Sequence, residues 1–573
     1  MKSALISFGP QEPSLTSVSR AHLRVTPTLP SMSDISKPAQ QSSQGGERND
    51  AGARARVEDV PRPRKTRAFY MSVLAIMVAS FLSALDLTAV GTALPTIAAA
   101  LKDTKGEFTW VGAAYALSST AFIPLSGSLA DAFGRRPILL TSIAFFGIGS
   151  ALSGAAQNMA GIGGGGILNL TEVLIADLVP LAERGLYQGL VGLAWSLASC
   201  IGPPIGVLNL PLTGVTFALV AVFLRVRTPP GSVKEKLGKV DWIGNALAIF
   251  GSGLVIIGLA WGGIRYPWAS APVLTTLILG MLFLGTFAVY EATVPTRPTI
   301  PIDVISNRTS LSGLLTVATH SIASTAIIYY LPVFFQACFG ASPVRSAVDF
   351  LPGALLTAPF ALVAGILVLV WQRYREINWI AWVFMVVAFG LTSTLKANAS
   401  TAQWVGFQVV AAIGVGLNCS APLFPILAPL KPERAGSALA LFCFTRAFFQ
   451  AWGIAIAGTI LQNELHHHLP VAFVAQFPPH FEIAYAAIPS INALEEPLRS
   501  EVQAAFASSL AMIWKVMVGI CGLGLLFSML MKEVPMTMLK DDRFALEEQD
   551  DKVYNLENLN TVQPVPQVTD SPA

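Results

Sequence analysis

A succession of apolar runs, each long enough to cross a bilayer as a helix, constrains this chain most. From Phe69 onward such runs alternate with short polar segments. About 20 apolar residues in a helix span the hydrocarbon core, and a helix satisfies its own backbone polar groups there. The composition agrees, because 53% of the residues are hydrophobic and only 12% are charged. The sequence therefore predicts an all-α polytopic membrane protein and argues against a soluble enzyme.

Windows of this length predict about fourteen transmembrane helices. The expected spans are 69–98, 109–129, 138–156, 159–178, 187–206, 207–224, 242–262, 273–291, 311–335, 348–371, 378–395, 404–427, 436–461 and 509–531. The segments before and after them, 1–67 and 532–573, are polar and are predicted to be disordered tails.

Lysine and arginine are distributed unevenly between alternate loops. The rich loops carry 62–67, 135–136, 225–239, 373–375 and 431–434, whereas the other set is much poorer in basic residues. Basic loops remain in the cytoplasm. This pattern predicts an even number of spans with both termini cytoplasmic. The segment 463–508 then forms a loop on the opposite side.

One polar loop between the second and third spans carries a recognisable motif. It runs from Gly127 through Asp131, Gly134, Arg135 and Arg136 to a proline. Glycines allow two helices to approach closely around a very short loop. The pattern resembles the signature cytoplasmic loop of the major facilitator superfamily at nearly every fixed position. The resemblance implies the major facilitator fold and transport of a small-molecule substrate.

Further stretches resemble the fungal drug:proton antiporter family with fourteen transmembrane spans. They are 85–95, which contains Asp86, the segment Gly202-Pro203-Pro204-Ile205-Gly206, and 241–244. The resemblance implies proton-coupled antiport that exports small amphipathic compounds, drugs or toxins. It also implies a monomer with a six-helix bundle over 68–225, an inserted pair of spans within 226–310 and a second bundle over 311–531, with the substrate between the bundles.

Ionisable residues inside the spans are the candidates for proton coupling and for lining the substrate cavity. They are Asp86, Glu172, Arg446 and His320. Each costs about 2.5–3.5 kcal/mol to insert and normally faces a cavity or a partner. We expect Asp86 and Glu172 to carry protons, with Arg446 as a countercharge. The alternatives are a fixed ion pair that never titrates and, for His320, a packed hydrogen-bonding side chain.

The resemblance implies a second group of functional residues at the cytoplasmic face. Asp131, Arg135 and Asp177 would form a charge relay that latches the inner side, with Asp131 near Gly436 at the start of a later span. Simple helix capping is the alternative. Aromatic side chains are candidates to line a permissive pocket, although most of them are expected to face lipid or to pack; the candidates are Trp195, Phe334, Phe335, Phe448 and Phe449.

Cofactor, metal and nucleic-acid sites are not expected. The five cysteines match neither a zinc site nor a disulfide framework, and the run 466–468 of three histidines is interpreted as solvated. The glycine-rich stretch 161–166 opens a span and follows no strand, so close helix packing explains it better than dinucleotide binding. No phosphate-binding loop pattern is present, which leaves an ion gradient as the driver.

Two positions depart from the family pattern and leave other functions open. The region 157–161 lacks an expected arginine, and 206–209 runs directly from one span into the next. Both suggest short deletions at outer loops, so that spans 3–6 look shortened. A transport-deficient membrane protein is therefore one alternative. A vacuolar transporter of basic amino acids is another, with the vacuolar membrane in place of the plasma membrane.

Overall fold

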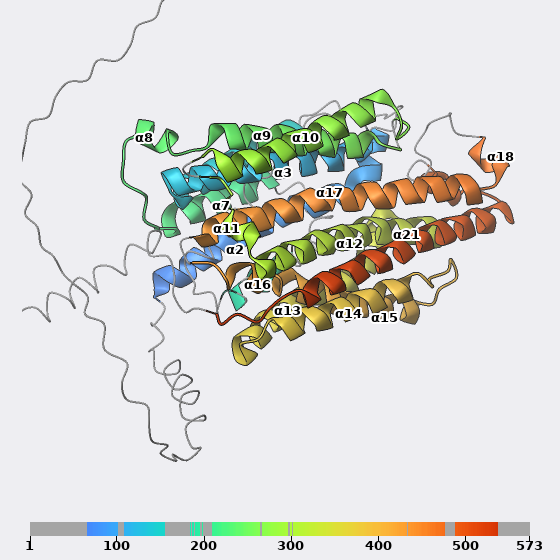
Figure 1. The fold of residues 1–573 in the computed structure, drawn as a ribbon. Helices are drawn as coiled ribbons and strands as arrows, with labels where there is room; N and C mark the ends of the chain where they lie inside the picture. Colours follow the sequence, from blue (N-terminus) through green and yellow to red (C-terminus); the bar gives the residue numbers. More distant parts are fainter. Residues whose placement is uncertain are drawn as a thin grey trace, which may run out of the picture. The chain divides into compact units, whose positions relative to one another are not determined.

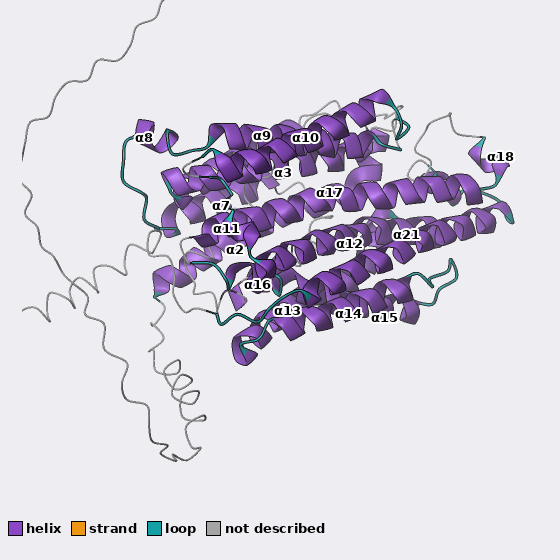
Figure 2. Ribbon diagram, viewed as in Figure 1, coloured by secondary structure: helices purple, strands orange, loops and turns teal. Residues whose placement is uncertain are grey.

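The computed structural model describes most of the chain between residues 66 and 536. The described residues are 66–100, 108–154, 184, 186–187, 189–194, 198, 209–263, 266–295, 298–300, 302–431, 434–475 and 487–536, without the side chains of 86–100, 108–116, 118–119, 152–154, 209 and 472. These residues form helices and connecting loops, and no strand occurs among them (Figure 2). The predicted all-α class is confirmed. The predicted tails, apart from residues at their edges, and most of 155–208 lie outside the described residues.

The helices keep one set of labels in the text and in Figure 1. Their bounds are α2 Arg67–Ala100, α3 Phe108–Phe133, α4 Arg135–Gly154, α7 Asn209–Phe223, α8 Val233–Leu237, α9 Trp242–Trp261, α10 Ala271–Thr293, α11 Asp303–Ser306, α12 Arg308–Phe339, α13 Pro343–Trp371, α14 Arg375–Thr392, α15 Thr401–Ser420, α16 Leu423–Leu427, α17 Ala435–His468, α18 Val471–Val474, α20 Ile488–Ile491 and α21 Leu498–Met529.

Nine of the helices in the described part of the chain are long and apolar enough to cross a membrane. A shorter apolar helix covers 210–223, and α3 and α4 coincide with the second and third predicted spans. This set is compatible with about fourteen spans. The predicted span 159–178 lies outside the described residues, as does most of 187–206.

Two helices extend well beyond the apolar windows that predicted them. Helix α17 continues for about two turns past residue 461, and α21 begins about three turns before residue 509. The predicted loop 463–508 is therefore partly helical, and the three histidines 466–468 form the last turn of α17. Hydropathy detects the lipid-facing length of a helix, whereas helical hydrogen bonding continues into the polar interface.

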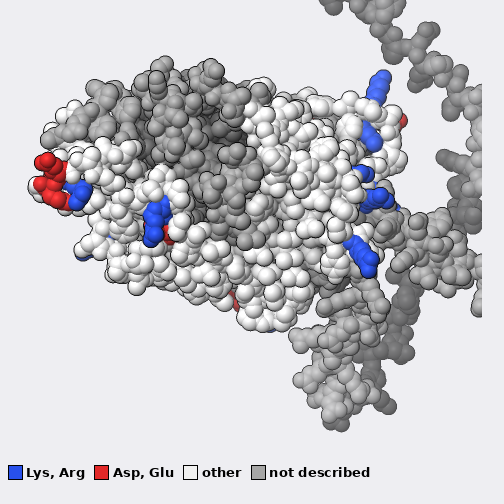
Figure 3. Space-filling view, turned by 180° about the vertical axis from the view of Figure 1, so that it is seen from behind, with Lys and Arg blue, Asp and Glu red and all other residues white. Residues whose placement is uncertain are grey.

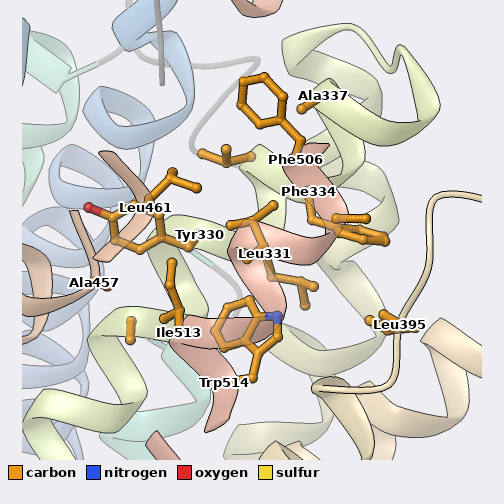
Figure 4. Close-up of a cluster of buried hydrophobic side chains, with 14 of the residues drawn as sticks. Tyr330, Leu331, Phe334, Ala337, Leu395, Ala457, Leu461, Phe506, Ile513 and Trp514 are labelled. Atoms are coloured by element: carbon orange, nitrogen blue, oxygen red, sulfur yellow. The ribbon is translucent and has the colours of Figure 1, made fainter. Parts of the chain in front are cut away.

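The long helices lie side by side along a common direction (Figure 1). In the second half of the chain α12 packs against α17 and α21, and α14 packs against α15 and α21. Their shared core includes Tyr330, Leu331, Phe334, Leu461 and Trp514 (Figure 4). In the first half α2, α4 and α7 surround a separate core.

Two of the aromatic candidates for a pocket belong to a packed core. Phe334 is 1% exposed and Phe335 is 0% exposed. The ring of Phe335 lies 5.1 Å from that of Trp404, in an edge-on arrangement. Packing is the outcome expected for most of the aromatic candidates, and side chains that pack against other rings are not available to a cargo. Trp195 lies outside the described residues.

Helices α9 and α10 form a tight hairpin that contacts both halves of the chain. A Cβ atom on Gly280 of α10 would lie 2.7 Å from the backbone nitrogen of Val255 on α9, so the small residue is needed for the close approach. Helix α9 also packs against α3 of the first half and against α17 of the second half.

Basic side chains gather at one end of the helices. On the face in Figure 3, lysine and arginine lie mainly at one end. The helix termini there include the beginnings of α2, α4, α12, α14 and α17 and the ends of α3, α10 and α21, and we call it the basic end. Its loops are those that the sequence predicts to be cytoplasmic.

The segment after α21 is hydrogen-bonded to the turn between α13 and α14 at the basic end. The Tyr374 hydroxyl donates to the Lys532 carbonyl at 2.6 Å and accepts from the Val534 backbone at 3.0 Å. The Tyr374 backbone N–H donates to the Glu533 carboxylate at 3.1 Å. Burial raises the pKa of Tyr374 to about 12 and raises the pKa of Glu533 above its usual value.

Candidate transport site

The loop between α3 and α4 is a turn around a single residue, Gly134. Its φ of 96° lies in the region that residues with a Cβ rarely adopt. A Cβ there would also lie 3.0 Å from Cγ2 of Thr228. Gly127, the first residue of the motif, is buried within α3. The spacing of the motif thus produces a tight reversal at the basic end.

An ion pair beside this turn contacts the second half of the chain. Asp131 on α3 accepts from Arg135 on α4 at 2.6 Å, and Arg135 is 2% exposed. A Cβ on Gly436, in the first turn of α17, would lie 3.0 Å from Nη2 of Arg135 and 3.7 Å from Oδ1 of Asp131. The structure therefore brings Asp131 and Arg135 together against the start of α17. The neighbouring Arg136 donates to the carbonyl of Ala221, next to the end of α7.

We expect Arg135→Gln to reduce the transport rate by about tenfold, which corresponds to 1.4 kcal/mol. The variant removes a buried cation from the contact between α3, α4 and α17 and leaves Asp131 without its partner. The measurement is substrate flux in membrane vesicles, normalised to the amount of the protein.

The matched control is Arg434→Gln at the same end. Arg434 pairs with Asp303 at 3.2 Å, but the two side chains are 45% and 56% exposed. Exposed pairs contribute about 0–1 kcal/mol, so this variant should transport almost normally. Equal losses in both variants would show that the rate depends on basic charge at this end and not on the buried contact.

Two of the predicted interior residues lie on facing helices of the second half. His320 on α12 is 8% exposed, and its Nε2 has no hydrogen-bond partner among the described residues. Arg446 on α17 lies over the ring of Phe442, 4.4 Å from its centroid, and interacts electrostatically with His320. An imidazole and a guanidinium within an apolar bundle can bind polar groups of a cargo.

Other buried polar atoms of the described helices also lack a hydrogen-bond partner. Asn418 on α15 is 2% exposed, and both polar atoms of its amide lack partners within the described part of the chain. Ser80 and Ser83 on α2 and Thr120 on α3 share this property. Buried polar atoms are nearly always hydrogen-bonded, so water or a cargo is the expected partner. Sequence reasoning missed Asn418 because a neutral amide in a span carries no charge signal.

The remaining predicted residues are placed only in part. Asp86 lies within α2, but its side chain is outside the described set. Glu172, Asp177, Gly202, Pro203 and Gly206 also lie outside the described residues. Among the residues searched for metal ligands, no group of histidine, cysteine and acidic side chains could hold an ion.

A comparison with known families identifies the fold. The model of the Major Facilitator Superfamily matches residues 76–454. The chain belongs to the Major Facilitator Superfamily. Its relatives in this superfamily are transporters, and the chain is accordingly a multi-pass membrane transporter and not an enzyme.

Fungal members of the superfamily resemble the chain over nearly its whole length. The MFS-type transporter gkaD of Penicillium citrinum is 34% identical over 92% of this chain and 95% of its own. Efflux pump FUS6 of Gibberella moniliformis is 33% identical over 87% of this chain and 94% of its own. An auto-inhibited POT family peptide transporter of known structure has a TM-score of 0.51 at 14% identity, covering 82% of this chain and 99% of its own. That likeness supports the superfamily fold alone.

Proposed function

We propose that this transporter exports small amphipathic compounds in exchange for protons. The observation that carries the direction of transport is the similarity to proteins named efflux pumps, at 33% identity over 87% of this chain for FUS6. The fungal relatives also include the efflux pump dotC of Dothistroma septosporum, at 32% identity over 82% of this chain.

Proton coupling is supported by the ionisable residues of the apolar bundle. Asp86 lies within α2, and His320 and Arg446 lie on α12 and α17. A carboxyl group in surroundings of low polarity can bind and release a proton near neutral pH. Asp86 and Glu172 would carry the protons, and Arg446 would stabilise their charged state.

The contact at the basic end supports alternating access. Asp131 and Arg135 of the first bundle touch Gly436 of the second bundle, as a closed inner gate requires. Opening the cavity to the cytoplasm would separate these residues. The basic end would face the cytoplasm, with both termini, and the plasma membrane is the proposed location.

We expect cells that express the chain to accumulate less drug than control cells, and we expect a protonophore to abolish the difference. The test uses a yeast strain without its own drug pumps, a fluorescent amphipathic drug and a check that the protein reaches the membrane. Export that persists without a proton gradient would contradict the coupling.

Transport assays in isolated membranes separate the alternatives. Inhibition of uptake into vacuolar vesicles by lysine or arginine would favour a transporter of basic amino acids. No flux of any cargo by protein that is correctly inserted would favour the transport-deficient alternative.

A further inference from the structure

A polar cluster lies at the basic end of the α9–α10 hairpin, about one helical turn along α3 from the ion pair of Asp131. Asp241 precedes α9, and its Oδ1 accepts from the Gly244 backbone at 2.9 Å and from the Tyr290 hydroxyl at 3.2 Å. Its Oδ2 is buried and has no hydrogen-bond partner among the described residues. A helix-capping role explains Oδ1 and leaves Oδ2 unexplained.

The second carboxyl group of the cluster belongs to Glu291 near the end of α10. Glu291 is only 7% exposed, and its two oxygens accept from the backbone nitrogens of Thr299 and Ile300, each at 3.3 Å. The carboxyl groups of Glu291 and Asp241 lie within hydrogen-bonding reach of each other. They meet beside Gly244, where a Cβ would lie 2.7 Å from Oε1 of Glu291 and closer still to Oδ2 of Asp241.

The described side chains that contact the two carboxyl groups are polar and carry no positive charge. Asn245 is 1% exposed and donates to the Asp241 carbonyl at 2.7 Å, to Thr299 at 3.2 Å and to Ser128 of α3 at 3.3 Å. The Oδ1 atom of Asn245 is buried without a partner in the described structure. The titratable group that faces the pair is Tyr290 from α10, whereas α3 and the segment 298–300 present hydroxyl groups.

No lysine, arginine or histidine among the described residues forms an ion pair with either carboxyl group. Two adjacent carboxylates without a cation repel each other strongly in a site of low polarity. A single proton removes this repulsion and also supplies the donor that Oδ2 of Asp241 lacks. Paired carboxyl groups of this kind titrate as a unit.

We propose that Asp241 and Glu291 share one proton. The hydrogen bond through this proton links the start of α9 to the end of α10 at the basic end. The resulting hydrogen bond joins a carboxylic acid to a carboxylate. It lies beside Ser128, which is one helical turn from Asp131 on α3. Loss of the proton as the pH rises leaves two carboxylates in contact and weakens the link between α9 and α10. The hydrogen bond between Asp241 and Glu291 is therefore intact at low pH and is lost as the pH rises.

Infrared difference spectroscopy of the purified transporter at neutral pH tests the shared proton directly. Subtracting the spectrum of Glu291→Gln from that of the native protein should reveal the carbonyl absorption of a protonated carboxyl group. Asp241→Asn should give the same band, because either variant destroys the pair. Asp349→Asn is the control. Its carboxylate pairs with Arg345 at 3.0 Å, so only an ionised carboxylate should be lost.

Thermal stability against pH supplies a second readout. Between about pH 4, where carboxyl groups of the unfolded chain ionise, and about pH 7, the Tm of the native protein should fall by about 2–4 °C more than that of Glu291→Gln, whose amide can donate to Asp241 at any pH. Glu291→Ala should be less stable at every pH. Difference spectra without a protonated carboxyl band, or parallel Tm profiles of the native protein and Glu291→Gln, would overturn the proposal.

Discussion

Replacement of Gly524 by valine should destabilise the transporter more than any other single change considered. Gly524 on α21 faces Trp382 on α14, and a Cβ there would lie 2.6 Å from Cζ2 of the indole ring. Trp382 is 0% exposed and is surrounded by the core of the second bundle. The ring has no space into which it can move, and overpacking of this kind costs about 1–3 kcal/mol. We expect Tm in detergent to fall by about 5 °C, with a lower yield of folded protein.

The same helix offers a matched control for this variant. Gly519 and Gly522 also lie on α21, but a Cβ at either position would meet nothing within 4 Å. Valine at these positions changes helix propensity by the same amount and adds no contact with a neighbouring helix. Their Tm should remain close to that of the native protein. A similar loss in all three variants would attribute the effect to propensity and not to the contact with Trp382.

Replacement of Asp86 by asparagine should abolish export that depends on the proton gradient. Asparagine has nearly the same shape as aspartate but cannot bind and release a proton at this position. Drug accumulation in cells should rise to the level of cells without the transporter. Asp86→Glu, which retains a carboxyl group, should keep part of the activity.

The control for this experiment is Asp303→Asn. Asp303 lies at the basic end, is 56% exposed and pairs with the exposed Arg434. Its neutralisation should leave export unchanged when membrane levels of the protein are equal. Full protonophore-sensitive export by Asp86→Asn would remove Asp86 from the coupling mechanism and leave Glu172 as the candidate carrier.

Hydropathy predicted the transmembrane helices well where lipid alone determines their length. Helix α2 begins two residues before its predicted span, and α3 begins one residue before its own. The same reasoning failed at the end of α17 and at the start of α21, where the helices extend into polar sequence. Glu464 and the histidines that follow it interrupt the apolar run without interrupting the helix. Apolar length and helical length are different properties, and only the first follows from hydropathy.

The site was predictable where a local motif sets the geometry. The motif around Gly134 specifies a one-residue reversal, and its acidic and basic residues lie close together for that reason. Side-chain contacts between segments that are distant in the sequence were harder to predict. Glu291 was taken as the end of a span because a charge closes an apolar window. Its contact with Asp241 depends on how α9 and α10 pack, which the sequence of either helix alone does not reveal.

The position of α9 between α3 and α17 has a mechanical consequence. Val255, Ile256 and Leu259 of α9 contact Phe448, Ala451 and Ala455 of α17. These side chains form no hydrogen bonds across the contact, so sliding one surface over the other breaks no directional bond. In the proposed alternating-access cycle, an apolar contact of this kind would allow the two bundles to rock while α9 stays in place. Because α9 packs against both α3 and α17, which also contact each other, it covers one side of the seam between the two bundles.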